Sequence, residues 1–162
     1  EYYSRLGRGK FTAMRHSNIY GPYDKYDLQR AHVFGATITK VLSAKNGKVN
    51  VWGTGEEERD LLYIDDLNNF VENALKNQKQ SFGLYNCGSG KSISIESLVN
   101  KIIKTSGKEL VVEHDLSQPT IKTSLSLDCS KAEKEINWKP KTSIDDGIVK
   151  TIDWWKNNVK SF

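Results

Sequence analysis

The chain has 162 residues, with 24 basic and 20 acidic side chains, a net charge of +4 and 37% hydrophobic residues, as in an ordinary globular protein. Its apolar stretches are far shorter than a membrane span, and its charges are too scattered to indicate nucleic-acid binding. Two cysteines and three histidines give neither a disulfide framework nor a zinc spacing. We therefore expect no membrane, no nucleic acid and no metal as partners, and, since no signal peptide is recognisable, a cytoplasmic location.

Helical and strand patterns alternate along the chain, which predicts an α/β fold. The chain opens with what reads as the last turn of a helix, residues 1–5, ended by Gly7 and Gly9. A strand over 10–16 and a loop rich in Gly, Pro, Asn and Asp over 17–27 follow. The remaining expected elements are a helix over 29–44, strands over 49–53 and 59–64, a helix from Asp65 or Asp66 to 77, a strand over 82–87, a helix over 95–105, a strand over 110–114, a strand or extended segment over 124–128, and helices over 130–136 and 144–158.

The most conspicuous motif is LYNCGSGKSISIESLVNKII, residues 84–103, in which an apolar run, a glycine turn, Lys91-Ser92 and a helical pattern succeed one another. A phosphate-binding P-loop requires G-x-x-x-x-G-K-[ST], and its first glycine would stand at Tyr85. The loop is therefore too short to surround a phosphate. We expect a tight strand-to-helix turn with Ser94 as the helix N-cap.

Two polar residues next to predicted strands are candidates for anion binding. Asn18 follows the strand over 10–16, and ligands of open α/β sheets bind beyond the carboxyl ends of strands. Its amide suits a phosphate or a sugar hydroxyl, although an Asx-turn explains it as well. Arg59 has the planar fork that binds phosphate through two hydrogen bonds, although an ion pair with a neighbouring acid, from Glu56 to Asp60, explains it equally.

His32 lies at the start of the predicted helix, just after a loop. Histidine is the side chain best able to exchange a proton near neutral pH. A lone histidine is more often structural, and no neighbour in the sequence would orient this one. From the residues alone, the chain is an α/β protein with a candidate cleft for an anionic ligand.

Four motifs follow one another along the chain: Arg15-x-x-Asn18-x-Tyr20-Gly21-Pro22, Val51-Trp52-Gly53-x-Gly55, Arg59-Asp60 with Tyr63-Ile64-Asp65-Asp66, and Tyr85-Asn86-x-Gly88-x-Gly90. In this order and spacing they resemble the C-terminal half of the extended short-chain dehydrogenase/reductases, a family of nucleotide-sugar epimerases, dehydratases and reductases. The resemblance implies the C-terminal portion of a Rossmann-like dinucleotide-binding fold, interleaved with a small α/β substrate-binding lobe. Residues 1–27 and 58–107 would be the remnant of the dinucleotide-binding domain, and residues 28–57 and 108–162 the substrate-binding lobe.

The resemblance also implies roles for individual residues. The stretch from Asn18 to Lys40 is most similar to family members that epimerise and reduce a GDP-linked 4-keto-6-deoxymannose. There His32 would be catalytic, donating a proton to a sugar ring carbon while a hydride reduces the 4-keto group. The nucleotide-diphosphate sugar would be bound by Asn18, Lys40, Trp52, Arg59 and Lys122. The cofactor, NADP or NAD, would be contacted by His16 and Ile19, although the family has proline where His16 stands.

Two family features have no counterpart in this chain: the Gly-x-x-Gly-x-x-Gly fingerprint and the Tyr-x-x-x-Lys pair, both of which lie upstream in the family. We therefore expect a piece of a longer enzyme that forms a homodimer, the piece being inactive by itself. Two alternatives stay open. One is an epimerase or dehydratase of the same family acting on a UDP-, dTDP- or CDP-sugar, and the other is a non-catalytic sugar-nucleotide binding module.

Overall fold

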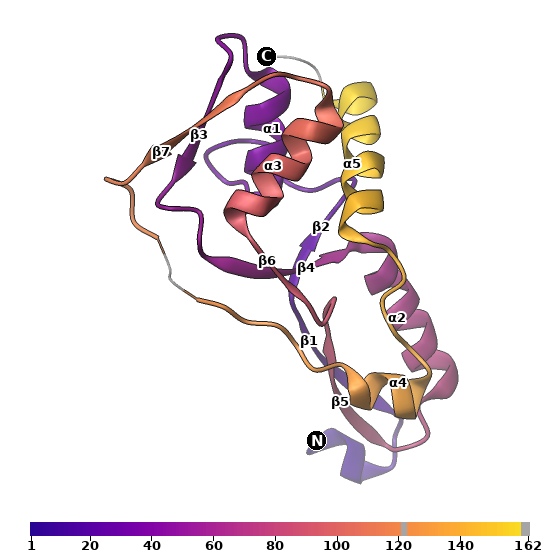
Figure 1. Ribbon diagram of the computed structural model, residues 1–162. Helices are drawn as coiled ribbons and strands as arrows, with labels where there is room; N and C mark the ends of the chain where they lie inside the picture. The colour runs from indigo at the N-terminus through magenta and orange to yellow at the C-terminus, as the bar shows by residue number, and fades with distance from the viewer. Residues whose placement is uncertain (121–122, 160–162) are drawn as a thin grey trace. The chain divides into compact units, whose positions relative to one another are not determined.

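A computed structural model describes residues 1–120 and 123–159 of the chain (Figure 1). Strands and helices alternate along it, and the α/β class is confirmed. The elements are η1 (Tyr3–Leu6), β1 (Phe11–His16), β2 (Asn18–Tyr20), α1 (Val33–Ser43), β3 (Lys48–Trp52), β4 (Glu58–Tyr63), α2 (Ile64–Asn77), β5 (Phe82–Cys87), β6 (Ser92–Ser94), α3 (Ile95–Ser106), β7 (Val111–Asp115), α4 (Ser130–Ile136) and α5 (Ile144–Asn158).

The chain divides into two compact units whose ranges interleave along the sequence. Unit 1 comprises Glu1–Ile19, Asp60–Ser92 and Leu125–Thr142, and unit 2 comprises Tyr20–Arg59, Ile93–Ser124 and Ser143–Phe162. The stretch 93–107, which the family resemblance assigns to the dinucleotide-binding part, falls in unit 2. Compactness does not by itself define a functional domain, so the domain bounds given above remain a prediction.

Unit 1 contains a parallel pair of strands, β1 and β5, in register from Phe11 opposite Phe82 to His16 opposite Cys87. The apolar faces of α2 and α4 contribute to one core with these strands. Within the core, the ring of Phe70 meets that of Trp138 edge to face, with centroids 5.1 Å apart. Aromatic pairs favour this geometry because the positive edge of one ring meets the negative face of the other.

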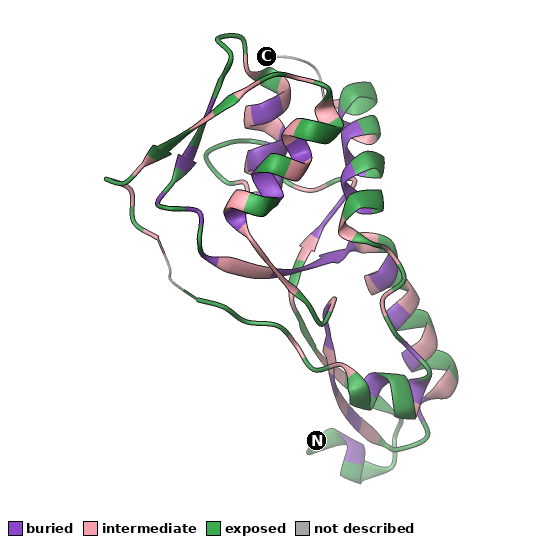
Figure 2. Ribbon diagram, viewed as in Figure 1, coloured by how far each residue is buried: buried purple, intermediate pink, exposed green. Residues whose placement is uncertain are grey.

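Unit 2 combines a second parallel pair, β3 and β7, with three helices; α3 packs against both α1 and α5. Helix α3 shows why the sequence predicts its helices well. Ile95, Leu98, Val99 and Ile102 recur at helical spacing and are buried, and Ser94 accepts a hydrogen bond from the Ser97 N–H, as an N-cap does. Figure 2 shows the resulting alternation of buried and exposed residues along α3 and α5.

Several predicted elements are corrected by the structure. Residues 18–20, expected in a loop, form β2, and the unpredicted β6 joins it in a sheet of order β2-β4-β6. Residues 124–128 form no strand in the described part of the chain. Three-residue strands carry too little periodicity to be recognised, because the pairing that stabilises them comes from distant residues.

The starts of two helices also differ from prediction. Helix α1 begins at Val33 rather than Gln29, because Asp27 organises a separate turn: its carbonyl accepts from the Ala31 N–H at 2.7 Å and its carboxylate from the Gln29 N–H at 2.9 Å. Helix α2 begins at Ile64 with Tyr63 as N-cap, so neither Asp65 nor Asp66 caps it. The buried Asp66 carboxylate instead accepts the N–H groups of Lys141 and Thr142, each at 2.9 Å.

Candidate functional site

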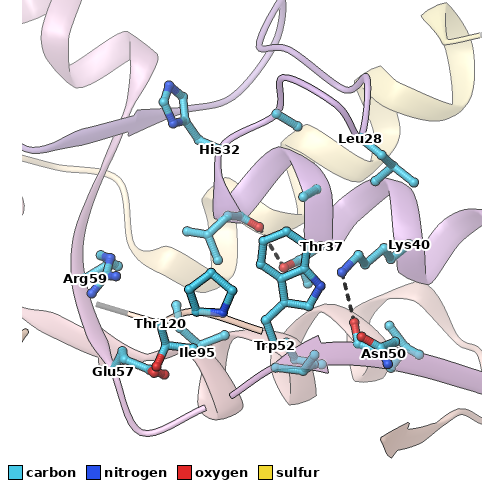
Figure 3. Close-up of a pocket in the computed structure, with 17 residues that line it drawn as sticks. Leu28, His32, Thr37, Lys40, Asn50, Trp52, Glu57, Arg59, Ile95 and Thr120 are labelled. Carbon is cyan, nitrogen blue, oxygen red and sulfur yellow. Dashed lines mark hydrogen bonds between the residues drawn. The ribbon is translucent and has the colours of Figure 1, made fainter. Parts of the chain in front are cut away.

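Unit 2 contains a cavity of about 380 Å³, within the range of small-molecule sites. Its walls come from α1, from β3 and from the segment that leads into β4, as Figure 3 shows. The start of α3 and residues 119–120 complete it. The lining residues are Leu28, Ala31, His32, Val33, Ala36, Thr37, Lys40, Val49, Asn50, Val51, Trp52, Glu57, Arg59, Ile95, Val99, Pro119 and Thr120.

Lys40 and Trp52 form one side of this cavity. Lys40 lies in the last turn of α1, and its Nζ donates to the backbone oxygen of Asn50 at 3.1 Å. The same ammonium lies 5.5 Å from the centroid of the Trp52 ring, which is 54% exposed at the end of β3. Burial lowers the pKa of Lys40. The pair offers a flat aromatic face beside a cationic donor, an arrangement suited to a planar, electron-rich ring.

Arg59 and His32 lie on the other side, away from Lys40 in Figure 3. The Nη1 of Arg59 donates to the backbone oxygen of Glu58 at 2.8 Å and to the Oγ1 of Thr123 at 3.0 Å. These bonds hold the guanidinium near the start of β4. A guanidinium has five N–H donors, so the group can bind an oxyanion as well.

His32 is the N-cap residue of α1, and its side chain makes no capping hydrogen bond. Its backbone oxygen accepts from the Ala36 N–H at 2.9 Å, which fixes the residue at the helix terminus. The imidazole is exposed and borders the cavity. Its position leaves the ring available for proton exchange with a ligand in the cavity.

Three of the residues suggested by the family resemblance lie in unit 1. Asn18 is in β2, and its Nδ2 donates to the backbone oxygen of Asp60 at 3.2 Å. His16 is exposed at the end of β1, with Nδ1 2.8 Å from the Ser17 oxygen, and Ile19 packs against the unit 1 core. Lys122 lies outside the described residues.

The glycine turn at 88–90 holds a carboxylate of the protein itself. The side chain of Asp60, 2% exposed, accepts the N–H groups of Ser89 at 2.7 Å, Gly90 at 3.3 Å and Leu127 at 3.0 Å. The Ser89 hydroxyl donates to it as well, at 2.7 Å. The turn therefore does collect N–H groups around an anion, as phosphate-binding loops do. The anion is Asp60, which confirms that this motif is not a P-loop.

Two findings bear on other classes of site. In residues 1–120 and 123–159, no group of three or more His, Cys, Asp or Glu side chains is placed to hold a metal ion. Every helix in the same part of the chain is too short or too polar to cross a bilayer.

Several residues that line the cavity could not be recognised from the sequence. Glu57, which is 6% exposed, lines the cavity, whereas Glu56 before it is exposed and Glu58 after it is half-buried. In a run of three glutamates nothing local distinguishes the buried one. Leu28 and Thr120 come from loops, where no periodicity exists to indicate a face.

Comparison with known proteins identifies the family. The profile of the NAD dependent epimerase/dehydratase family matches residues 1–88. The chain belongs to this family. A GDP-L-fucose synthase of Sinorhizobium fredii (strain NBRC 101917 / NGR234) is 34% identical over 161 residues, which are 98% of this chain and 50% of that protein.

Two solved structures of UDP-sugar 4-epimerases are similar to the chain. A UDP-glucuronic acid 4-epimerase of Bacillus cereus, in complex with UDP-glucuronic acid and NAD, is 28% identical with a TM-score of 0.77, over 89% of this chain and 44% of that one. A UDP-glucose 4-epimerase of Thermotoga maritima, with UDP-glucose, has a TM-score of 0.85 over 98% of this chain and 50% of that one. Because its sequence identity is 22%, this likeness shows the fold alone. The chain spans about half the length of the curated relatives it matches.

Proposed function

We propose that this chain supplies the nucleotide-sugar site of an NAD(P)-dependent epimerase/reductase acting on a GDP-linked 4-keto-6-deoxymannose. The observation that carries the proposal is that Lys40, Trp52, Arg59 and His32, four residues suggested by the family resemblance, border one cavity. The similarity to a GDP-L-fucose synthase over nearly the whole chain supports the same reading. Asn18, His16, Ile19 and Lys122 remain predicted contacts.

The chemistry of the cavity fits the three parts of such a ligand. Trp52 and Lys40 suit guanine, since the ring stacks on a purine and the ammonium donates to guanine O6 or N7. Arg59, farther along the wall, suits the diphosphate. His32 then lies near the sugar, where its protonated imidazole donates a proton to a ring carbon and becomes neutral.

The glycine turn at 88–90 does not form a cradle for the cofactor diphosphate. A dinucleotide pyrophosphate needs free backbone N–H groups at a glycine turn, and Asp60 already accepts those of Ser89 and Gly90. The cofactor, NADP or NAD, belongs to the proposal for the whole protein.

Binding of nucleoside diphosphates to this chain tests the ligand class. We expect GDP to bind more tightly than UDP, dTDP or CDP in calorimetric titrations. Arg59→Ala should weaken GDP binding by about 1.5–3 kcal/mol, roughly 10- to 150-fold, because it removes a charge-assisted contact. Arg8→Ala, an exposed arginine of unit 1, is the matched control and should leave the dissociation constant unchanged. Preference for a pyrimidine nucleotide would favour a UDP-, dTDP- or CDP-sugar enzyme of the family.

Product stereochemistry in the whole protein that contains this chain tests the reaction. His32→Asn should lower the rate of epimerisation by roughly 10²- to 10⁴-fold, the usual cost of losing a general acid. Exchange of the ring hydrogens with solvent deuterium should still begin, and the product should shift towards the unepimerised sugar. A normal product formed at a normal rate would return His32 to a structural role. Failure of the whole protein to turn over any nucleotide sugar would favour a binding module.

A further inference from the structure

One acidic side chain lies in the wall of the cavity. Glu57 is 6% exposed, and among the described residues that line the cavity it is the only acidic one. Glutamate is rarely buried in proteins, so a buried glutamate at a candidate ligand site is informative. The charged groups of Lys40 and Arg59 only donate hydrogen bonds, whereas a carboxylate only accepts them. The cavity therefore combines charged donors with one charged acceptor.

The turn after β3 holds this carboxylate near Trp52. Gly53, the residue that follows Trp52, has a φ of 69°. A Cβ at Gly53 would stand 3.2 Å from the Oε1 of Glu57 and would overlap the side chain of Thr120, so only glycine suits this position. The backbone oxygen of Glu57 accepts the Ile95 N–H at 2.9 Å, which fixes Glu57 at the start of α3.

Trp52 and Lys40 by themselves do not discriminate among nucleobases. Every base has a flat face that can stack on an aromatic ring. Lys40 can donate to guanine O6 or N7, but the carbonyl oxygens of the pyrimidines and the N7 of adenine accept from an ammonium as well. In Figure 3, Lys40 lies on one side of Trp52 and Glu57 on the other. Glu57 is thus the charged group that can read a second edge of a stacked base.

We propose that Glu57 selects guanine by accepting hydrogen bonds from the N1–H and the N2 amino group of the base. The inference rests on the proposed function, in which the ligand is a nucleotide-linked sugar, and names the base. Guanine presents these two donors side by side, so they match the two oxygens of a carboxylate. Uracil and thymine present one N3–H between two carbonyl oxygens, and adenine and cytosine present an amino group beside a ring nitrogen that accepts. Each of these bases would direct at least one lone pair at the carboxylate of Glu57.

Inosine diphosphate (IDP) tests this contact without any substitution. Its base, hypoxanthine, keeps the N1–H, O6 and N7 of guanine and lacks the N2 amino group. IDP therefore removes one of the two proposed bonds and leaves the stacking and the contact with Lys40. In calorimetric titrations of the chain, IDP should bind roughly 10- to 150-fold more weakly than GDP, as expected for one hydrogen bond to a charged group. Equal dissociation constants would overturn the inference.

Glu57→Gln assigns the effect to this side chain. Gln has the shape of Glu, but its NH₂ group would meet a donor of guanine. The variant should bind GDP roughly 10- to 150-fold more weakly than the parent and should bind GDP and IDP alike. UDP should bind the variant more tightly than it binds the parent, because Gln can accept from N3–H and donate to the adjacent carbonyl oxygen.

Glu56→Gln, in the same turn, is the matched control. Glu56 is exposed and accepts from the Thr54 hydroxyl at 3.1 Å, so this variant should keep the dissociation constants of the parent for all three nucleotides. Urea denaturation of both variants verifies that they fold. The comparison of GDP with IDP uses the parent chain, so it decides the matter even if Glu57→Gln does not fold.

The outcomes separate this inference from the proposed function. If the parent prefers GDP to the pyrimidine nucleotides but binds IDP equally well, Glu57 does not read the base and the proposed function stands. The same holds if Glu57→Gln keeps the difference between GDP and IDP that the parent shows. If the parent prefers UDP, dTDP or CDP, or binds none of these nucleotides, the proposed function fails and this inference fails with it.

Discussion

Replacing Asp60 by Asn tests whether the glycine turn of unit 1 is held by a carboxylate. Asp60 accepts four hydrogen bonds, three of them from the backbone N–H groups of Ser89, Gly90 and Leu127. Asn has the same shape, but one of its two terminal atoms is a donor. That NH₂ group would face N–H groups that are themselves donors. The substitution therefore changes hydrogen bonding without making a cavity.

The expected cost follows from the number of bonds lost. One amide oxygen can accept two of the four donors, so about two donors, which are half-buried in the structure, lose their partner. Each buried unsatisfied donor costs about 1–3 kcal/mol. We expect Asp60→Asn to lower the free energy of unfolding by about 2–6 kcal/mol, a large part of the roughly 5–15 kcal/mol typical of a domain.

Urea denaturation of the chain, followed by far-UV circular dichroism, measures this loss. With a slope of about 2 kcal/mol per molar urea, the middle of the usual range, the midpoint should fall by roughly 1–3 M. Asp153→Asn, on the exposed face of α5, is the matched control and should stay within about 0.5 kcal/mol of the parent. A loss for Asp60→Asn no larger than the control would refute the view that the carboxylate organises the turn.

Three further changes test other parts of the structure. Gly147→Ala should destabilise the chain by about 1–3 kcal/mol although alanine favours helices, because the new Cβ would stand 2.0 Å from the hydroxyl of Tyr20, which is 2% exposed. Adding Tyr20→Phe should recover part of the loss in the same urea assay. A Gly147→Ala variant more stable than the parent would contradict this packing. Burial raises the pKa of Cys87 to about 12, so at pH 8 this residue should carry roughly 10³-fold less thiolate than an ordinary thiol. Labelling with a thiol reagent should therefore require unfolding. Rapid labelling of Cys87 in the native protein would contradict its burial. Ser94→Ala should lower the free energy of unfolding by about 1 kcal/mol, because α3 loses its N-cap. Ser126→Ala, at an exposed site, should cause no loss measurable by urea denaturation. Equal effects of the two substitutions would show that Ser94 does not stabilise α3 as an N-cap.

The elements predicted well are those specified by nearby residues. Helix α5 (Ile144–Asn158) agrees with the expected range because Ser143 caps it, accepting from the Asp146 N–H at 3.1 Å, and because Ile148, Ile152 and Trp155 recur on its buried face. The short strands β2 and β6 escaped prediction because their ladder depends on β4, far away in sequence. The start of α1 was misplaced because Asp27 stabilises a turn that competes with the first helical turn.

The candidate site was predictable in part, and only with the help of the family resemblance. The local pattern left Arg59 undecided between an anion and its acidic neighbours, and it left His32 without any partner. The structure brings both to one cavity with Lys40 and Trp52, although these residues come from α1, β3 and β4. Such a grouping depends on how the helix packs against the strands, and this packing is not encoded in any local window of the chain.

The turn at Gly88-Ser89-Gly90 shows why a motif of this kind is ambiguous from sequence. Successive backbone N–H groups that point into a tight turn make a site for a negative charge, whatever molecule carries that charge. The spacing of the glycines excluded a P-loop, but it could not identify the anion that the turn binds, because Asp60 lies 28 residues before Gly88. A carboxylate from the same chain fits best, since it is present at high effective concentration and satisfies the donors permanently. A glycine turn after a strand therefore indicates phosphate binding only when no acidic side chain of a neighbouring strand can reach it, and in this protein Asp60 does reach it.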